Sequence, residues 1–181
     1  GKTAVSQLLA EKLGASHIDL GEIVKRERLT AGFDRRRATL IADEDKLKRR
    51  VQELIDQCTS NVIVDGHYAA SIIPKRQVTR AFVLRCHPAQ LKERMDQRYL
   101  KDTKLWENLA AEILDVSLYD AVMNLSRKKV CEVDTTNKTV EVVAHEIVSI
   151  LEGRERCRVR VVDWLGRLED EGSLDYYLKQ F

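Results

Sequence analysis

The 181-residue sequence is poor in the features that define several special protein classes. With two prolines, eight glycines and no repeat, it is not a low-complexity chain. None of its apolar runs approaches the roughly 20 residues of a membrane helix, so we expect no membrane partner. Hydrophobic residues make up 44% and charged residues 33% of the chain, which is typical of a globular protein with its own core.

Cysteine and net charge are also limited. The four cysteines have no spacing typical of a zinc site. We therefore expect reduced thiols in a cytoplasmic protein, or a nuclear one if the source is eukaryotic. The net charge is +2, too small to predict nucleic-acid binding for the whole chain, although basic residues cluster locally.

Apolar periodicity predicts helices that alternate with short strands. Helices are expected over 3–14, 21–30, 44–58, 88–99, 104–126 and 139–153. Strands are expected over 16–20, 61–66, 80–86 and 129–136. This alternation is typical of βαβ crossovers and predicts an α/β fold with a mostly parallel sheet. Asp43 is a candidate helix cap, and Gly14 suits a helix C-terminus.

The segments outside this alternation are assigned separately. "AGFDRRRATL" is interpreted as a loop between helices, and "RCRVRVVDW" alternates like a strand. We expect a core over residues 1–153 and a C-terminal appendage over 154–181.

The first three residues, Gly1, Lys2 and Thr3, match the end of the phosphate-binding motif G-x-x-x-x-G-K-[ST]. In such a loop, Lys2 would reach the β and γ phosphates and Thr3 would bind Mg²⁺. The triplet is weak alone, but it directly precedes a strongly periodic helix that leads into a βαβ pattern.

A carboxylate at the end of the strand in "VIVDGH" strengthens the hypothesis. P-loop enzymes hold Mg²⁺ partly through an Asp in such a place, which Asp65 would supply. The alternative is that Asp65 only caps a loop. His67 follows and could orient water or relay a proton, although a lone histidine is more often structural.

Two basic stretches could neutralise phosphate charge, because arginine binds phosphate through a bidentate fork. The segment between two predicted helices suits a lid over 98–107 and supplies Arg94, Arg98 and Lys104. The predicted loop suits an acceptor phosphate and supplies Arg35, Arg36 and Arg37.

Taken together, the parts resemble a nucleoside monophosphate kinase, and more narrowly the adenylate kinase isoenzyme 6 type, over residues 1 to about 152. The resemblance is carried by "GKT", "SHIDLGEIVK", "DEDKL", "VIVDGHYA" and "QRYLKDTKLWENLAAEILDV". It implies a three-layer P-loop nucleotide kinase fold whose first strand and first half of the phosphate loop are missing here. It also implies an AMP-binding region near 21–58.

The resemblance further implies conversion of ATP and AMP to two ADP with Mg²⁺, slow ATP hydrolysis, and a role in small ribosomal subunit maturation. It places Lys2, Thr3, Asp65 and His67 at the catalytic centre and Arg98 on the ATP side of the lid. A small-subunit ribosomal protein is the implied partner, with rRNA or the pre-ribosome reached through it. Ala4 and the triplet Arg98-Tyr99-Leu100 depart from the family pattern.

Three alternatives stay open. The chain could be an assembly factor switched by ATP, a scaffold that no longer binds nucleotide, or a kinase for another monophosphate. We also expect the natural protein to carry roughly ten or more residues before Gly1, forming one apolar strand and a glycine-rich turn.

Overall fold

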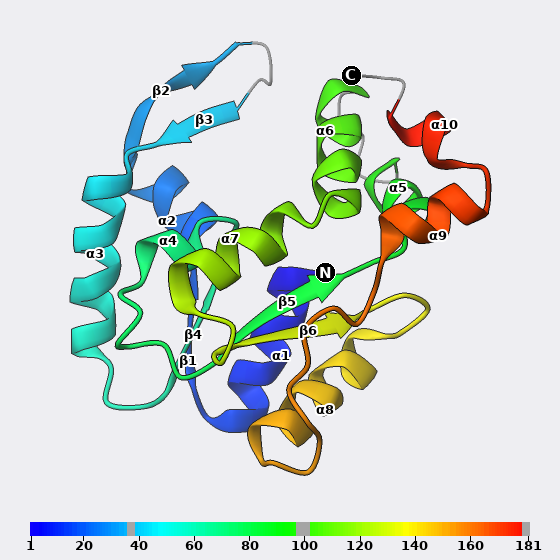
Figure 1. Ribbon diagram of the computed structural model, residues 1–181. Coiled ribbons are helices and arrows are strands. Elements are labelled where there is room, and N and C mark those ends of the chain that lie inside the picture. The colour runs from blue at the N-terminus through cyan, green and yellow to red at the C-terminus, as the bar shows by residue number, and fades with distance from the viewer. Residues whose placement is uncertain (36–38, 97–101, 179–181) are drawn as a thin grey trace.

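The computed structural model describes residues 1–35, 39–96 and 102–178 and has a mixed α/β architecture (Figure 1). Its helices are α1 (Lys2–Leu13), α2 (Leu20–Arg26), α3 (Glu44–Gln57), α4 (Ala69–Ile72), α5 (Pro88–Asp96), α6 (Asp102–Ile113), α7 (Val116–Leu125), α8 (Val140–Leu151), α9 (Trp164–Asp170) and α10 (Leu174–Leu178). Its strands are β1 (Ser16–Asp19), β2 (Thr30–Asp34), β3 (Thr39–Ala42), β4 (Val62–Asp65), β5 (Ala81–Arg85) and β6 (Val130–Asp134).

The predicted parallel pairing is confirmed for two strand pairs. β1 pairs with β4 in a register that sets Asp19 opposite Asp65. β5 pairs with β6, with Arg85 opposite Asp134. Among the described residues, no strand pairing joins the two pairs. The strand expected before Gly1 stays a prediction.

Local signals in the sequence set several helix ends. Asp43 caps α3 as predicted, because its carboxylate accepts a hydrogen bond from the Lys46 N–H at 3.1 Å. Gly14 ends α1 in the left-handed conformation, with φ of 58°, as a C-terminal glycine does. Pro88 is the first residue of α5, where its missing N–H costs nothing.

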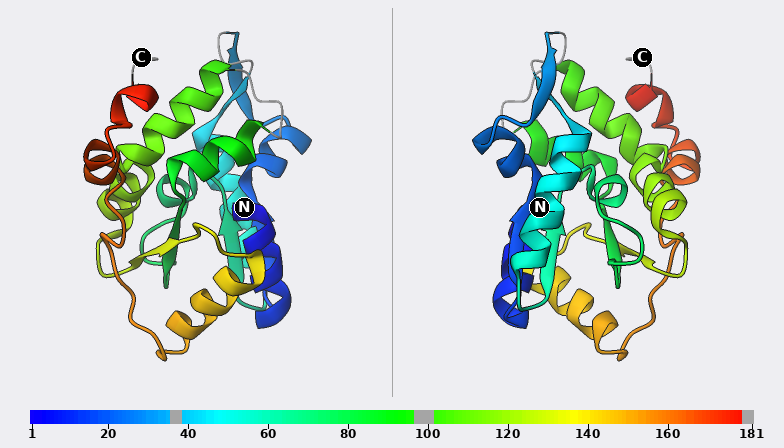
Figure 2. Two further views of the ribbon diagram at one scale, coloured as in Figure 1. Left: turned by 90° about the vertical axis from the view of Figure 1, so that its right-hand side faces the viewer. Right: turned by 90° about the vertical axis from the view of Figure 1, so that its left-hand side faces the viewer.

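Two apolar clusters hold the strand pairs to their helices. One joins α1, β6 and α8 through Val5, Leu9, Val133 and Ile147. The other, formed by β1, α2, α3 and α4, includes Leu47, which is fully buried. Figure 2 shows α1 and α8 together on one side of the molecule. These contacts fix the start of α1 relative to the ends of β1 and β4.

The predicted loop over 31–40 is wrong in its secondary structure. β2 and β3 form an antiparallel hairpin in which Phe33 lies opposite Leu40, and it projects from the body beyond α2 and α3 (Figure 1). The apolar and β-branched residues on either side of the arginines are strand formers, and the arginine run obscured that pattern. The predicted helix over 21–30 accordingly ends earlier, at Arg26.

The predicted helix over 104–126 is also wrong, because the chain breaks between α6 and α7. Asp115 adopts φ of 56°, a left-handed conformation that ends a helix. Its carboxylate reaches the guanidinium of Arg85, 2.5 Å away. This contact between distant parts of the chain coincides with the break and could not be read from helical periodicity.

Arg85 is the centre of a buried ionic cluster. Its side chain is 1% exposed and pairs with Glu112, Asp115 and Glu132. Burial alone would lower the pKa of Arg85, but the surrounding carboxylates outweigh it and raise the pKa above its ordinary value. The guanidinium therefore stays charged and joins β5, β6 and the junction of α6 with α7.

The C-terminal segment is tied to the same cluster. Trp164 is buried, and its indole N–H donates to Glu112 at 2.9 Å. The Val161 N–H donates to Glu132 at 2.7 Å. Leu168 and Tyr177 then pack against α6. The strand-like reading of 156–164 is wrong: this stretch forms no strand and turns at Arg160, whose φ is 62°. The division at residue 153 stays a prediction.

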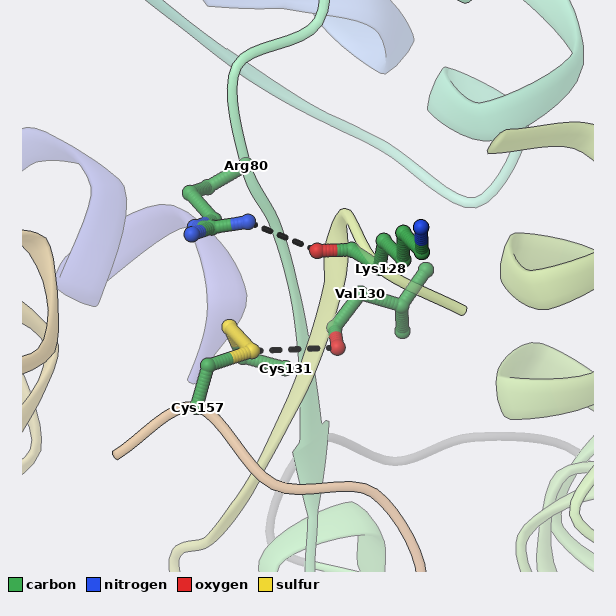
Figure 3. The surroundings of a disulfide bond; sticks show 5 residues. All are labelled: Arg80, Lys128, Val130, Cys131 and Cys157. Atoms are coloured by element: carbon green, nitrogen blue, oxygen red, sulfur yellow. Dashed lines mark hydrogen bonds between the residues drawn. A yellow bond between two sulfur atoms is a disulfide. The ribbon is translucent and has the colours of Figure 1, made fainter. Parts of the chain in front are cut away.

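The expectation of four reduced thiols is wrong for two of them. Cys131 of β6 and Cys157 form a disulfide, shown in Figure 3, that closes a loop of 26 residues. Cys58 and Cys86 are free thiols. The spacing of the cysteines along the chain did not predict the pairing. Cys131 and Cys157 are separated by α8 in the sequence and come together only in the folded structure.

Candidate functional site

The carboxylates of Asp19 and Asp65 converge on the first turn of α1. The two residues end adjacent parallel strands in register. The hydroxyl oxygen of Thr3 lies 3.4 Å from a carboxylate oxygen of each. Asp65 is buried, and Asp19 also caps α2 by accepting from the Glu22 N–H. A hydroxyl between two carboxylates is an oxygen-rich set that suits a hard cation such as Mg²⁺.

His17 fixes the orientation of the Asp65 carboxylate. It lies two residues before Asp19 on β1, so both side chains point to the same face of the strand. Its Nε2 is 2.9 Å from the second carboxylate oxygen of Asp65. With the proton on Nε2, the imidazole donates to this oxygen and leaves the other oxygen directed at Thr3.

His67 lies in a strongly positive environment. Its pKa is lowered from 6.5 to about 4, first by the charge of Lys2, then by burial and by the charge of Lys104, while Asp65 opposes the shift. Because the side chain of His67 is exposed to solvent, the charge of Lys2 contributes more to the lowered pKa than burial does. The imidazole is neutral at pH 7, and the two lysines lie near it.

Gly66 allows the turn between Asp65 and His67 to pass close to α2. Its φ is 155°, and an added Cβ would lie 2.8 Å from the Leu20 side chain. A larger residue would push the turn away from α2 and shift both of its neighbours.

The start of α1 is suited to an anion. The helix begins at Lys2, and its cap Gly1 offers no side chain to the first N–H groups. Thr3 carries the hydroxyl of the carboxylate site in the same turn. N–H groups at a helix start attract phosphate through their partial positive charge. The triplet Gly1-Lys2-Thr3 therefore stands beside the two carboxylates.

Within the described residues, the other cations predicted from the sequence are not among those that contact Thr3 or Asp65. Arg94 lies on α5, after the carboxyl end of β5, where its guanidinium is 2.8 Å from the side-chain oxygen of Gln90 and 3.4 Å from the carbonyl of Thr135. Arg35 is exposed just after β2. Arg36, Arg37 and Arg98 lie outside the described residues.

Two residues of this site were missed by sequence reasoning. His17 and Asp19 were assigned only to a short strand. The alternation of His17, Ile18 and Asp19 was available as a signal, because it puts two polar side chains on one face of a strand whose other face is apolar.

Within residues 1–35, 39–96 and 102–178, no group of three or more His, Cys, Asp or Glu residues could hold a metal by itself. A cation at Thr3 and Asp65 would therefore need further oxygen ligands, such as phosphates or water. None of the described helices is both long and apolar enough to cross a membrane.

Comparison with known proteins identifies the class. The AAA domain family matches residues 1–115. A protein of Methanocaldococcus jannaschii named "Putative adenylate kinase" is 36% identical over 175 residues, covering 97% of this chain and 93% of that protein. Proteins of the same name from Thermococcus onnurineus and Pyrococcus abyssi are 38% and 35% identical, each over 91% of this chain and 85% of its own length.

The architecture agrees with these matches. Its parallel strand pairs and the helix that follows Gly1 are those of a P-loop nucleotide kinase fold. The chain belongs to the AAA domain family of P-loop proteins and, within it, to the family of these adenylate kinase homologues.

Proposed function

We propose that the protein is a nucleoside monophosphate kinase that transfers the γ-phosphoryl group of ATP to AMP. The observation that carries the proposal is the position of Thr3, within 3.4 Å of both Asp19 and Asp65 at the start of the phosphate-motif helix. The names of the relatives point to the same reaction.

In this proposal Gly1, Lys2 and Thr3 bind the phosphates of ATP. Phosphoryl transfer needs little covalent help from the protein, so positioning and charge neutralisation carry most of the catalysis. The Lys2 ammonium neutralises the transferring group. Thr3 and Asp65 would hold Mg²⁺, which would neutralise phosphate oxygens when bound. His17 and Asp19 keep Asp65 and Thr3 in position.

The acceptor would bind near the β2–β3 hairpin. We propose residues 21–58 as the AMP-binding region, with Arg35, Arg36 and Arg37 on the acceptor phosphate. Arg94, Arg98 and Lys104 would serve the ATP side of a lid over 98–107. The charge of Lys104 already acts on His67, which supports its placement beside the reacting phosphates.

A slow ATPase activity belongs to the same proposal. His67 is neutral at pH 7, so a ring nitrogen without a proton can accept a hydrogen bond from an attacking water and orient it. Transfer to AMP has no such need, because the acceptor phosphate is itself the nucleophile.

A role in small ribosomal subunit assembly is the second part of the proposal. It rests on the resemblance carried by "VIVDGHYA" and "KLWENLAAEI" alone. The partner would be a small-subunit ribosomal protein, with rRNA or the pre-ribosome reached through it, in the cytoplasm or in a nucleus.

The experiment measures ADP formation with Mg·ATP alone, with AMP added, and with other monophosphates added. We expect a rate that rises strongly with AMP, yields two ADP per ATP consumed, and is lost in Lys2→Ala. A rate that is independent of AMP and needs a ribosomal partner would instead favour an ATP-switched assembly factor. Absence of Mg·ATP binding would favour a nucleotide-dead scaffold.

A further inference from the structure

A basic cleft lies apart from the candidate site, at the starts of β5 and β6. Its volume is about 700 Å³. Five of the side chains that line it are cations, and none is a carboxylate. The cations are Arg80, Arg127, Lys128, Arg158 and Arg160.

These cations are available to a ligand. All five are exposed, and none forms an ion pair with a carboxylate of the described residues. Several cations elsewhere on the surface are paired, as Arg50 is with Glu27 and Lys92 with Asp96. A cluster of unpaired like charges opposes folding by mutual repulsion and attracts polyanions.

One side of the cleft is held by hydrogen bonds between two strand-entry loops. The Arg80 guanidinium donates to the carbonyl of Lys128 at 2.7 Å. The Lys129 ammonium donates to the carbonyls of Lys75 and Val78. Figure 3 shows Arg80 and Lys128 where β5 and β6 begin. The Arg80 guanidinium and the backbone of the two entry loops are therefore fixed before any ligand arrives.

The other side is the C-terminal segment, which is also fixed. The Cys131–Cys157 disulfide joins it to β6 (Figure 3). The Glu132 N–H donates to the carbonyl of Arg158, and the Val161 N–H donates to the Glu132 carboxylate. These bonds hold Arg158 and Arg160 opposite the two entry loops.

We propose that this cleft binds the phosphate backbone of a nucleic acid. Four of its five cations are arginines, whose planar fork binds phosphate bidentately. The apolar part of the lining consists of Val130, Val159, Val161 and Cys157. The lining has no aromatic side chain on which a base could stack. We therefore expect the cleft to contact the phosphate backbone without recognising the base sequence.

The same lining argues against a protein partner. Protein interfaces have an apolar or aromatic centre with charges at the rim. Here exposed cations dominate and no aromatic anchor is present. The cleft, with a volume of about 700 Å³, is also larger than a single phosphate group would fill. A chain of phosphodiesters would meet several cations at once.

The test measures binding of a fluorescently labelled 20-base-pair RNA duplex by anisotropy at several salt concentrations, with saturating Mg·ADP present to occupy the nucleotide site. We expect a dissociation constant on the order of micromolar at roughly 50 mM salt, weakening steeply as salt rises. Arg158→Gln/Arg160→Gln should bind at least about tenfold more weakly, with a salt slope shallower by about 2.

Matched control variants distinguish RNA binding at the cleft from a general effect of positive charge. Lys48→Gln/Arg49→Gln removes the same charge from exposed positions of α3 and should bind RNA like the wild type. Arg80→Gln/Arg127→Gln changes the other side of the cleft and should reproduce the loss. Circular dichroism should show unchanged helix content in all variants, and AMP-dependent turnover should be unaffected in both cleft variants.

Three results would overturn the proposal. The first is the absence of RNA binding at low salt. The second is equal RNA binding by the wild type and by both cleft variants. The third is competition by poly-glutamate or tripolyphosphate that equals unlabelled duplex at the same charge concentration, since the occupant would then be an acidic peptide or a short polyphosphate.

Discussion

His17 and Asp65 are joined across two parallel strands by a contact of 2.9 Å between the imidazole Nε2 and a carboxylate oxygen. The contact occupies one oxygen of Asp65 and leaves the other 3.4 Å from the Thr3 hydroxyl. The carboxylate is thus oriented before a ligand binds, and this orientation underlies the first prediction.

His17→Ala should weaken Mg²⁺-dependent ATP binding by about 10- to 100-fold. This is the usual loss of affinity when a residue that orients a metal ligand is removed. The Asp65 carboxylate would be free to rotate away from Thr3. Isothermal titration calorimetry with and without Mg²⁺ measures the effect. His145→Ala on the exposed face of α8 is the control. An equal loss in Mg-free ATP binding would show that His17 supports the fold rather than the carboxylate.

His67 should titrate with a pKa of about 4 in the folded protein, observable by NMR of its ring protons. Lys2→Met removes the largest cause of the shift and should move the pKa toward 6.5. An unfolded chain binds this proton below about 6.5, whereas the folded chain does not until about 4. The contribution of His67 to stability is therefore complete above pH 6.5 and falls as the pH drops toward 4. A pKa unaffected by Lys2→Met would contradict the assigned cause.

Arg85→Met should lower the free energy of unfolding by about 3–5 kcal/mol, because three carboxylates would lose their buried cation. Urea unfolding followed by circular dichroism measures this change. Arg49→Met, at an exposed position of α3, should change it by less than about 0.5 kcal/mol. Losses of similar size in the two variants would mean that the cluster is not what holds the C-terminal segment.

Under non-reducing, denaturing conditions the protein should show two reactive thiols, Cys58 and Cys86, and four after reduction. Reduction should lower the free energy of unfolding by roughly 3–4 kcal/mol, the loop-entropy value for a 26-residue separation. Cys58→Ser should leave one reactive thiol and unchanged sensitivity to reductant. Four reactive thiols before reduction would contradict the disulfide.

The four strands of the parallel pairs could be predicted from the sequence because their signals are local. Short apolar runs predicted β1, β4, β5 and β6, and Asp65 was found because it directly follows one of them. The hairpin could not be predicted because the arginine run at 35–37 interrupts the pattern of strand-forming residues on either side of it.

Features that depend on distant contacts could not be predicted. The break at Asp115 accompanies its contact with Arg85, thirty positions away. The disulfide pairs a residue that precedes α8 in the chain with one that follows it. His17 gains a role only when β1 is set in register with β4. Each needs a tertiary neighbour that no periodicity reveals.

The central claim is that Asp65 and Thr3 together serve Mg·ATP at the start of α1. The most direct test is calorimetric titration of ATP into wild type and Asp65→Asn, each with and without Mg²⁺, with Asp120→Asn on the exposed face of α7 as control. We predict that Asp65→Asn weakens Mg·ATP binding by at least about tenfold while Mg-free ATP binds almost as before, because the lost charge serves the metal. Equal weakening with and without Mg²⁺, or none in either case, would contradict the account.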